Sequence, residues 1–172
     1  MVEVQHLIRD VPDFPEKGII FKDISPLLAN GPALEMVIEA MAKPYTDSKV
    51  EQVVGIESRG FIFGMGIALS LGCGFIPVRK TGKLPYKTLS QTYDLEYGTD
   101  TVEIHVDALE AGQRVLVVDD VLATGGTMQA TCQLLHKLNV SIIGVSFLME
   151  LNFLRGREKL STVKSITSLL TY

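Results

Sequence analysis

The stretch VLVVDDVLATGGT, residues 115–127, decides the fold. Its apolar first half predicts a buried strand at 116–118, of the near-continuous apolar kind found in parallel sheets. Two acids, Asp119 and Asp120, end that strand at the carboxyl edge of the sheet, where such sheets bind their ligands. A turn then leads into a helix expected over 126–138. The turn is made of Ala123, Thr124, Gly125, Gly126 and Thr127.

This turn has the chemistry of an anion site. Its glycines allow close backbone approach, the helix start offers free N–H groups, and the threonine hydroxyls add donors. It is not a P-loop, because no lysine follows at the required spacing. Two carboxylates beside a phosphate would repel it, but a ribose resolves the conflict: its hydroxyls donate to the acids while its 5′-phosphate enters the turn. The segment therefore predicts a grip for a phosphorylated ribose, with a plain capped strand-to-helix turn as the alternative.

Around this segment, strands and helices alternate. Further strands are expected at 53–56, 75–78, 102–106, 142–148 and 166–170, and further helices at 31–42 and 61–71. The fold class is α/β, with a central, mainly parallel sheet flanked by helices on both faces. The strand at 102–106 is expected to be exposed and antiparallel, and residues 79–92 to form an irregular, basic loop. With no internal repeat or linker, residues 1–172 are expected to form a single domain.

Composition excludes several classes of function. The net charge of −4 and a pI near 5.4 argue against nucleic-acid binding. No apolar run is long enough to span a membrane and no signal peptide is visible, so a cytoplasmic location is expected. The two cysteines have no zinc-type spacing. His6, His105 and His136 form no cluster, and we assign them no catalytic or metal role.

The 115–127 segment resembles the phosphoribosyl-pyrophosphate (PRPP) motif of the type I phosphoribosyltransferases. Other stretches are similar to the adenine phosphoribosyltransferase family in particular: PDFPEKGIIFKDISPLL, GIESRGFIFG, VRKTGKLP, YDLEYGTDTVEIH and ELNFLRGREKL. They follow one another in order over about residues 12–160. The resemblance implies the type I fold, with an N-terminal base-binding hood at about 1–35 and a flexible flap at about 79–97.

The GIESRGFIFG stretch predicts a second anion site, because a strand end and turn lead into a helix that opens at Gly60. Arg59 adds a guanidinium fork that suits phosphate. By resemblance this loop binds pyrophosphate, and the peptide bond between Glu57 and Ser58 is cis. The basic flap would close over the pyrophosphate and exclude water. The pyrophosphate-binding residues expected in all are Glu57, Ser58, Arg59, Arg79, Lys80 and Lys83.

The resemblance also indicates the base site. Ile20, Phe21 and Lys22 match the adenine-reading segment, in which backbone groups read the base edge and Phe21 stacks on one face, with Val121 opposite. Lys22 stands where the family usually has arginine. Glu96 matches the acid/base residue near purine N7, and Tyr97 follows it on the flap. A carboxylate at N7 suits a base that becomes more acidic as its N9 attacks.

These residues lead to one functional hypothesis: transfer of the 5-phosphoribosyl group from PRPP to adenine, giving AMP and pyrophosphate in purine salvage. Mg²⁺ is expected to arrive with PRPP and to touch Asp119 and Asp120 at most through water, with no metal bound directly by the protein. The resemblance implies a homodimer in which Arg79 lies near the partner's site. Two alternatives stay open: another acceptor (hypoxanthine, guanine, xanthine or uracil), and a PRPP-sensing regulator without catalysis. The chain lacks the extra DNA-binding length expected of the regulator.

Overall fold

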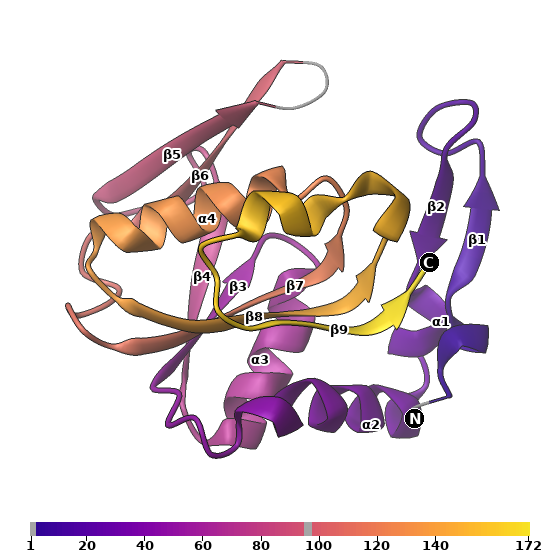
Figure 1. The fold of residues 1–172 in the computed structure, drawn as a ribbon, viewed down its shortest axis with the longest axis horizontal. Coiled ribbons are helices and arrows are strands. Elements are labelled where there is room, and N and C mark those ends of the chain that lie inside the picture. The colour runs from indigo at the N-terminus through magenta and orange to yellow at the C-terminus, as the bar shows by residue number, and fades with distance from the viewer. Residues whose placement is uncertain (1–2, 95–97) are drawn as a thin grey trace.

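The computed structural model describes residues 3–94 and 98–172. In this part of the chain, seven strands form the central sheet in the order β5-β6-β4-β3-β7-β8-β9 (Figure 1). Neighbouring strands from β4 to β9 run parallel, whereas β6 pairs antiparallel with both β4 and β5. The strands are β3 (Gln52–Ile56), β4 (Gly74–Lys80), β5 (Thr88–Asp94), β6 (Thr99–His105), β7 (Arg114–Leu122), β8 (Ser141–Glu150) and β9 (Ile166–Thr171).

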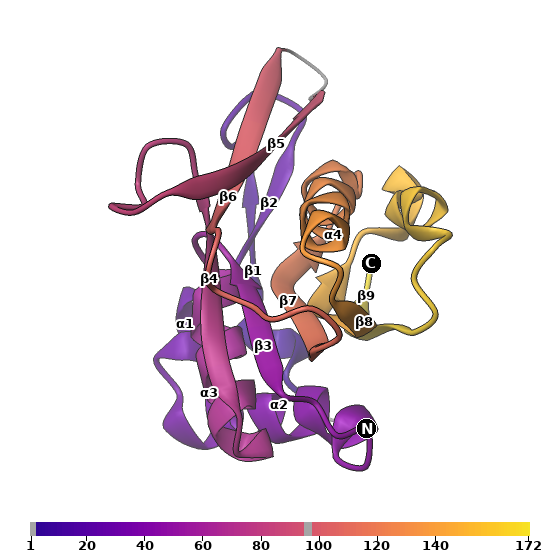
Figure 2. The same cartoon turned by 90° about the vertical axis from the view of Figure 1, so that its left-hand side faces the viewer.

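Helices cover both faces of this sheet, because the side chains of its central strands alternate between two cores. Leu116 and Val118 of β7 pack with α2 (Gly31–Ala42) and α3 (Gly60–Leu71). Val115 and Val117 pack on the other face, with α4 (Gly126–Lys137). Figure 2 shows α3 and α4 on opposite sides of the strands. The predicted fold class, an open and mainly parallel sheet with flanking helices, is confirmed.

The helix boundaries follow from local signals in the sequence. Asn30 caps α2, because its Oδ1 accepts a hydrogen bond of 3.2 Å from the N–H of Ala33. Gly72 ends α3 in the left-handed conformation, at φ +67°. The remaining helical pieces are short: α1 (Ser25–Leu28) and four 3₁₀ turns, η1 (Gln5–Leu7), η2 (Lys43–Tyr45), η3 (Asn152–Leu154) and η4 (Gly156–Leu160).

Two ribbons project beyond the carboxyl edge of the central sheet, at the top of both cartoon views (Figures 1 and 2). One is the hairpin of β1 (Arg9–Pro12) and β2 (Ile20–Asp23), a separate two-stranded sheet that was not predicted. The other is formed by β5 and β6. The turns at the ends of β3 and β7, which are predicted to bind anions, therefore lie between the expected hood and the expected flap.

The structure corrects three expectations about the strands. Strand β7 runs to Leu122, so Asp119 and Asp120 lie within the strand, close to its carboxyl end, and do not terminate it. Residues 79–92 are not irregular throughout, because Arg79 and Lys80 belong to β4 and Thr88 begins β5. Strand β6 is not exposed: its apolar side chains Val102 and Ile104 are buried against α4. No helix within residues 3–94 and 98–172 is long and apolar enough to cross a membrane.

Candidate active site

The turn after β7 forms a small cradle at the start of α4. Gly125 adopts φ +79° and stands at the N-cap position, where no side chain caps the helix. A cavity of about 140 Å³ is lined by residues 121–127 together with Asp119 and Met128. Residues 123–127, here called the phosphate loop, thus line a space far below the ~300–1,000 Å³ of whole-ligand pockets. The space suits a single group such as a phosphate.

The phosphate loop is backed by a segment whose role the sequence did not reveal. A Cβ added at Gly156 would run into the carbonyl oxygen of Ala123, and one added at Gly125 would run into the carbonyl oxygen of Gly156. The η4 segment therefore packs backbone to backbone against the loop, at a distance that only glycine permits. Its own position is fixed by Arg157, whose Nε lies 2.7 Å from the buried Glu150 carboxylate. In the sequence, the RGREKL run stood out only as part of a stretch that resembles a known family, and nothing in it indicated contact with the loop.

The two acids of β7 lie in different surroundings. Asp120 is buried, and its Oδ2 is 2.7 Å from Nη2 of Arg59. Asp119 accepts a hydrogen bond of 2.9 Å at Oδ1 from the N–H of Asp120. Burial raises the pKa of both carboxyl groups; the neighbouring Asp120 charge raises that of Asp119 further, while Arg59 opposes the rise at Asp120. The pair is thus a set of hydrogen-bond acceptors held in place by one arginine.

Helix α3 starts directly against this pair. A Cβ added at Gly60 would lie 2.8 Å from the carbonyl oxygen of Val118 and 2.9 Å from Oδ1 of Asp119. Only glycine lets the loop after β3 approach the end of β7 this closely. The two predicted anion turns are therefore adjacent in space as well as on neighbouring strands.

Glu57 gathers three donors from the expected pyrophosphate segment. Its Oε2 accepts from Nε of Arg79 at 3.2 Å and from the N–H of Lys80 at 3.0 Å, and its Oε1 pairs with Nζ of Lys83. Burial alone would raise the pKa of Glu57, but the donors, Lys83 first, lower it to about 2. The Glu57–Ser58 peptide bond is cis, as predicted. Five of the six predicted pyrophosphate residues therefore lie together. Arg79, Lys80 and Lys83 donate to the Glu57 carboxylate, and Ser58 follows Glu57 in the chain. Arg59 is the one with other partners.

Arg59 instead joins the acid pair to the hood. Its guanidinium lies 4.9 Å from the centre of the Phe21 ring, and its Nη1 donates to the carbonyl oxygen of Lys22 at 3.3 Å. The Lys22 side chain has different partners: its Nζ is 2.6 Å from Oδ1 of Asp10 and 3.9 Å from the centre of the Tyr172 ring. The Phe21 ring and the backbone of Lys22 on β2 therefore lie beside Arg59, while their predicted role in reading a base stays a prediction.

Of the other predicted base and flap residues, the structure describes two and leaves two undescribed. Ile20 is 56% exposed on β2, and Val121 on β7 lines the small cavity beside the phosphate loop. Glu96 and Tyr97 lie outside the described residues, so their roles remain predictions.

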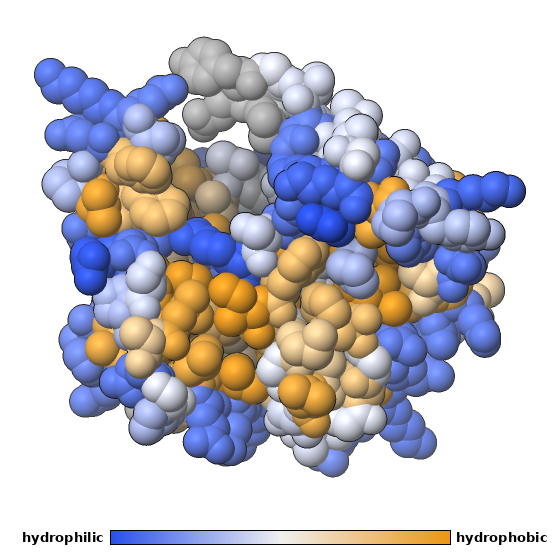
Figure 3. All heavy atoms as spheres, turned by 180° about the vertical axis from the view of Figure 1, so that it is seen from behind, coloured by the Kyte–Doolittle hydropathy of each residue, from blue (hydrophilic) through white to orange (hydrophobic). Residues whose placement is uncertain are grey.

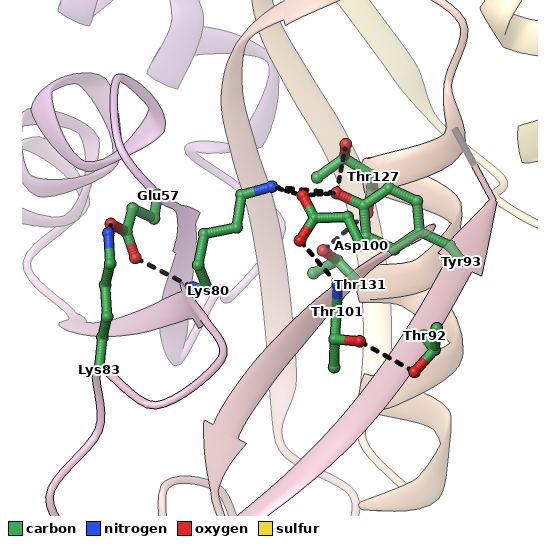
Figure 4. Close-up of polar contacts among 9 residues, drawn as sticks. All are labelled: Glu57, Lys80, Lys83, Thr92, Tyr93, Asp100, Thr101, Thr127 and Thr131. Atoms are coloured by element: carbon green, nitrogen blue, oxygen red, sulfur yellow. Dashed lines mark hydrogen bonds and ion pairs between the residues drawn. The ribbon is translucent and has the colours of Figure 1, made fainter. Parts of the chain in front are cut away.

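Two polar residues of the flap ribbon were missed by the sequence analysis. Asp100 pairs with Nζ of Lys80, and the Tyr93 hydroxyl lies between Asp100 and Thr127 of the phosphate loop (Figure 4). Reading 79–92 as an irregular loop hid the alternation of β5, which places Tyr93 on the face toward α4. A strand assignment for 88–94 would have indicated it.

The part of the chain that the structure describes offers few ligands for a metal ion. Within residues 3–94 and 98–172, no group of three or more His, Cys, Asp or Glu side chains could hold an ion. Asp119 and Asp120 each commit one oxygen, to a backbone N–H and to Arg59 respectively. The donor set therefore fits a metal that is carried mainly by a ligand's phosphates and reaches these acids through water.

Comparison with known proteins places this site in a class. The phosphoribosyl transferase domain matches residues 27–169, and the chain therefore belongs to the phosphoribosyltransferase family. Within that family, it is similar to adenine phosphoribosyltransferases. It is 58% identical to that of Nocardioides sp. over 98% of this chain and 93% of the relative. It is 51% identical to that of Geobacter metallireducens, over 100% of both chains.

Solved structures agree with this assignment. The adenine phosphoribosyltransferase of Thermoanaerobacter pseudethanolicus superposes with a TM-score of 0.95 at 50% identity, covering 99% of this chain and 98% of the other. The enzyme of Saccharomyces cerevisiae superposes with a TM-score of 0.92 at 41% identity, over 98% and 97% of the two chains. That structure holds adenine and an imino-altritol bisphosphate.

Proposed function

We propose that this protein transfers the 5-phosphoribosyl group of PRPP to adenine, forming AMP and pyrophosphate. One relationship carries the proposal: a phosphate-sized cradle and an acid pair at the end of β7 are joined through Arg59 to the aromatic face of Phe21. A sugar phosphate and a flat base are the two ligands that such a site can take side by side. The similarity to enzymes named adenine phosphoribosyltransferase, at 51% and 58% identity, supports adenine as the base.

The ribose 5-phosphate part would bind to the end of β7. The phosphate enters the phosphate loop, where backbone N–H groups at the start of α4 donate to it. The ribose 2′- and 3′-hydroxyls donate to the carboxylates of Asp119 and Asp120, of which Asp120 is buried and Asp119 half-buried. Holding the sugar at two points leaves its C1′ carbon facing the space between the two anion turns.

The pyrophosphate would bind around residues 57–59 and under the flap. Arg79, Lys80 and Lys83 supply positive charge. The ionised Glu57 holds the side chains of Arg79 and Lys83 together, while the Lys80 side chain pairs with Asp100. These cations stabilise the leaving group as the C1′–O bond breaks through an oxocarbenium-like state, so no nucleophilic side chain is required. Closure of the flap keeps water away from the activated sugar.

The base would be read by β2. Phe21 stacks on adenine, and the backbone groups of Ile20 and Lys22 read its edge, with Val121 on the opposite side. Because Arg59 occupies the face of Phe21 in this structure, adenine binds there only if the guanidinium moves aside. Glu96 takes the role of acid/base at N7, and Tyr97 accompanies it on the flap.

Magnesium would enter with PRPP. When bound, Mg²⁺ would neutralise charge on the leaving group. Asp119 and Asp120 are the residues that would hold its water ligands.

We further propose that the protein is a cytoplasmic homodimer with Arg79 near the partner's site. Figure 3 shows a broad apolar area on the face that carries α3. The exposed apolar residues on α2 and α3 are Met36, Ile62, Met65 and Leu69, of which Leu69 is 75% exposed. An apolar surface of this kind is typical of a protein–protein interface. Both cysteines are free thiols, which fits a reducing compartment.

The dimer is tested by analytical ultracentrifugation of two aspartate variants. Leu69→Asp should convert a wild-type dimer into monomers. Phe153→Asp, at a side chain 71% exposed away from α3, should leave the dimer unchanged. A monomeric wild type, or equal behaviour of the two variants, would contradict the proposed interface.

The activity is tested by incubating the protein with PRPP, Mg²⁺ and adenine and following AMP and pyrophosphate by chromatography. We expect both products in equal amounts, and none without PRPP. Tight PRPP binding without any product from adenine or from the other four bases would instead favour the PRPP-sensing regulator.

A further inference from the structure

The hydroxyl group of Tyr93 is the centre of a polar network that connects the flap to the phosphate loop. It lies 3.2 Å from Oδ2 of Asp100, 3.3 Å from Nζ of Lys80 and 3.1 Å from Oγ1 of Thr127 (Figure 4). These four residues, here called the resting network, come from β5, β6, β4 and α4 respectively. The network therefore ties three strands of the sheet to the first turn of the helix that carries the phosphate loop.

The chemistry of its members fixes the direction of each hydrogen bond. A lysine ammonium can only donate, and an ionised carboxylate can only accept. Burial alone would raise the pKa of Asp100, but the hydrogen bond from Lys80 and other donors lower it, so the carboxylate is ionised at neutral pH. The Tyr93 proton therefore goes to Asp100, and the Tyr93 oxygen accepts from Lys80. It follows that the single proton of the Thr127 hydroxyl goes to Tyr93.

The ribbon also lies directly over the phosphate loop. A Cβ added at Gly126 would be 3.6 Å from Cδ2 of the Tyr93 ring and 3.6 Å from the carbonyl oxygen of Asp94. A second contact holds the ribbon to α4, where Nζ of Lys137 donates to the carbonyl oxygen of Ser90 at 2.8 Å. The Thr127 hydroxyl thus donates toward β5, and Thr127 also lines the small cavity.

This arrangement commits one donor from each proposed phosphate site. Thr127 is expected to donate to the 5′-phosphate and Lys80 to the pyrophosphate, yet their protons are held by Tyr93 and Asp100. We propose that Tyr93 and Asp100 are positioning residues that compete with the phosphates of PRPP for Thr127 and Lys80. The proposal rests on the proposed function, since it needs the phosphate loop to receive a 5′-phosphate.

The consequence is that attachment of the flap ribbon to α4 and binding of phosphate in the phosphate loop weaken each other. When a phosphate oxygen accepts the Thr127 proton, the Tyr93 oxygen loses one of its two donors and keeps only Lys80. The ribbon is then held less firmly to α4, and part of the binding free energy is spent on the lost hydrogen bond. A substitution that removes the Tyr93 hydroxyl should therefore tighten phosphate binding, whereas damage to the structure would weaken it.

The test is isothermal titration calorimetry with ribose 5-phosphate, which reaches the phosphate loop and leaves the pyrophosphate site empty. Tyr93→Phe removes only the hydroxyl and keeps the ring over Gly126. We expect it to lower the dissociation constant about 2- to 5-fold, the effect of one ordinary hydrogen bond. In a Thr127→Val background, which has no proton to release, Tyr93→Phe should leave the dissociation constant unchanged.

Asp100→Asn is the second variant, because it replaces the acceptor that fixes the Tyr93 proton while retaining the size of the side chain. It should shift the affinity in the same direction. Equal or weaker binding by Tyr93→Phe and Asp100→Asn would overturn the inference, and so would a gain that persists with Thr127→Val. A wild-type protein that does not bind ribose 5-phosphate would refute the proposed function of the loop itself.

Discussion

Arg59 and Asp120 form an ion pair of 2.7 Å at the point where the two anion turns and the hood meet. The carboxylate is buried, whereas the Arg59 side chain is 28% exposed and also contacts the Phe21 ring and the Lys22 carbonyl oxygen. One arginine thus connects the proposed ribose site to the proposed base site. Its two roles, structural and ligand-binding, can be separated experimentally.

The structural role predicts energetic coupling between the two residues. Arg59→Met would leave a buried carboxylate without its partner, so adding Asp120→Asn should restore part of the lost stability. A double-mutant cycle in urea should give a coupling of about 1–3 kcal/mol. The pair of Lys22 and Asp10 is the control, because its carboxylate is 57% exposed where that of Asp120 is buried, and its coupling should stay below about 1 kcal/mol. Additive effects of Arg59→Met and Asp120→Asn would show that the pair is not coupled.

The close approach of α3 to β7 predicts that Gly60 cannot be replaced. The methyl group of Gly60→Ala would meet the Val118 carbonyl oxygen and Asp119, so we expect a loss of about 1–3 kcal/mol in the free energy of unfolding. Gly31→Ala is the control, because nothing lies within 4 Å of a Cβ there and alanine favours the helix. Equal stability of the two variants in urea denaturation would contradict the close contact.

Glu57 predicts a loss of stability in acid. Its pKa is lowered in the folded protein, from 4.5 to about 2, so its interactions with Lys83, Lys80 and Arg79 stabilise the fold fully above pH 4.5. That contribution should disappear as the pH falls from about 4.5 to about 2. Glu57→Gln should therefore be destabilised at pH 7 and lose less stability than wild type on acidification.

Melting temperatures measured between pH 7 and pH 2 test this prediction. Glu35→Gln, at an exposed position of α2, should follow the wild-type curve throughout. A Glu57→Gln protein with the same pH dependence as wild type would mean that the cluster contributes nothing to acid sensitivity.

Glu96 predicts a separation of turnover from binding. If its carboxylate exchanges a proton with N7 of the base, Glu96→Gln should lower kcat about 100-fold or more and change the PRPP dissociation constant less than about 3-fold. Asp94→Asn, two residues earlier in the chain, is the control and should retain near-normal kcat. Steady-state rates and PRPP titration measure both quantities; an unchanged kcat would remove the role of Glu96.

The sequence was most informative where one local pattern decided the structure. The apolar run before Asp119 predicted a central strand, and the helices expected at 31–42 and 61–71 match α2 and, within one residue, α3. Their caps, Asn30 and Gly72, involve only neighbouring residues. The cis bond at Glu57 was predicted from resemblance alone. The family resemblance is confirmed, whereas the roles of the individual site residues stay predictions.

What the sequence missed depends on contacts between distant residues. The hairpin of β1 and β2 has no long run in which apolar and polar residues alternate. Its link to the candidate site appears only in the folded chain, where Arg59 donates to the backbone carbonyl of Lys22. The role of Gly156 follows only from its contact with Gly125. The role of Tyr93 follows only from its hydrogen bonds with Thr127 and Asp100. Gly125 and Gly156 are 31 residues apart, and Tyr93 and Thr127 are 34 apart. Tyr93 and Asp100 are only seven residues apart but lie on separate strands, so the local sequence pattern does not show their contact.

The central claim is that adenine is the acceptor, and a competition assay tests it most directly. The protein is supplied with PRPP, Mg²⁺ and equal concentrations of adenine, hypoxanthine, guanine, xanthine and uracil, and the nucleotides formed are separated by chromatography. We expect AMP to exceed the sum of the other products by at least about 100-fold, because a site that hydrogen-bonds one base edge rejects a base that leaves its buried groups unpaired. A product mixture dominated by any other nucleotide would contradict the claim.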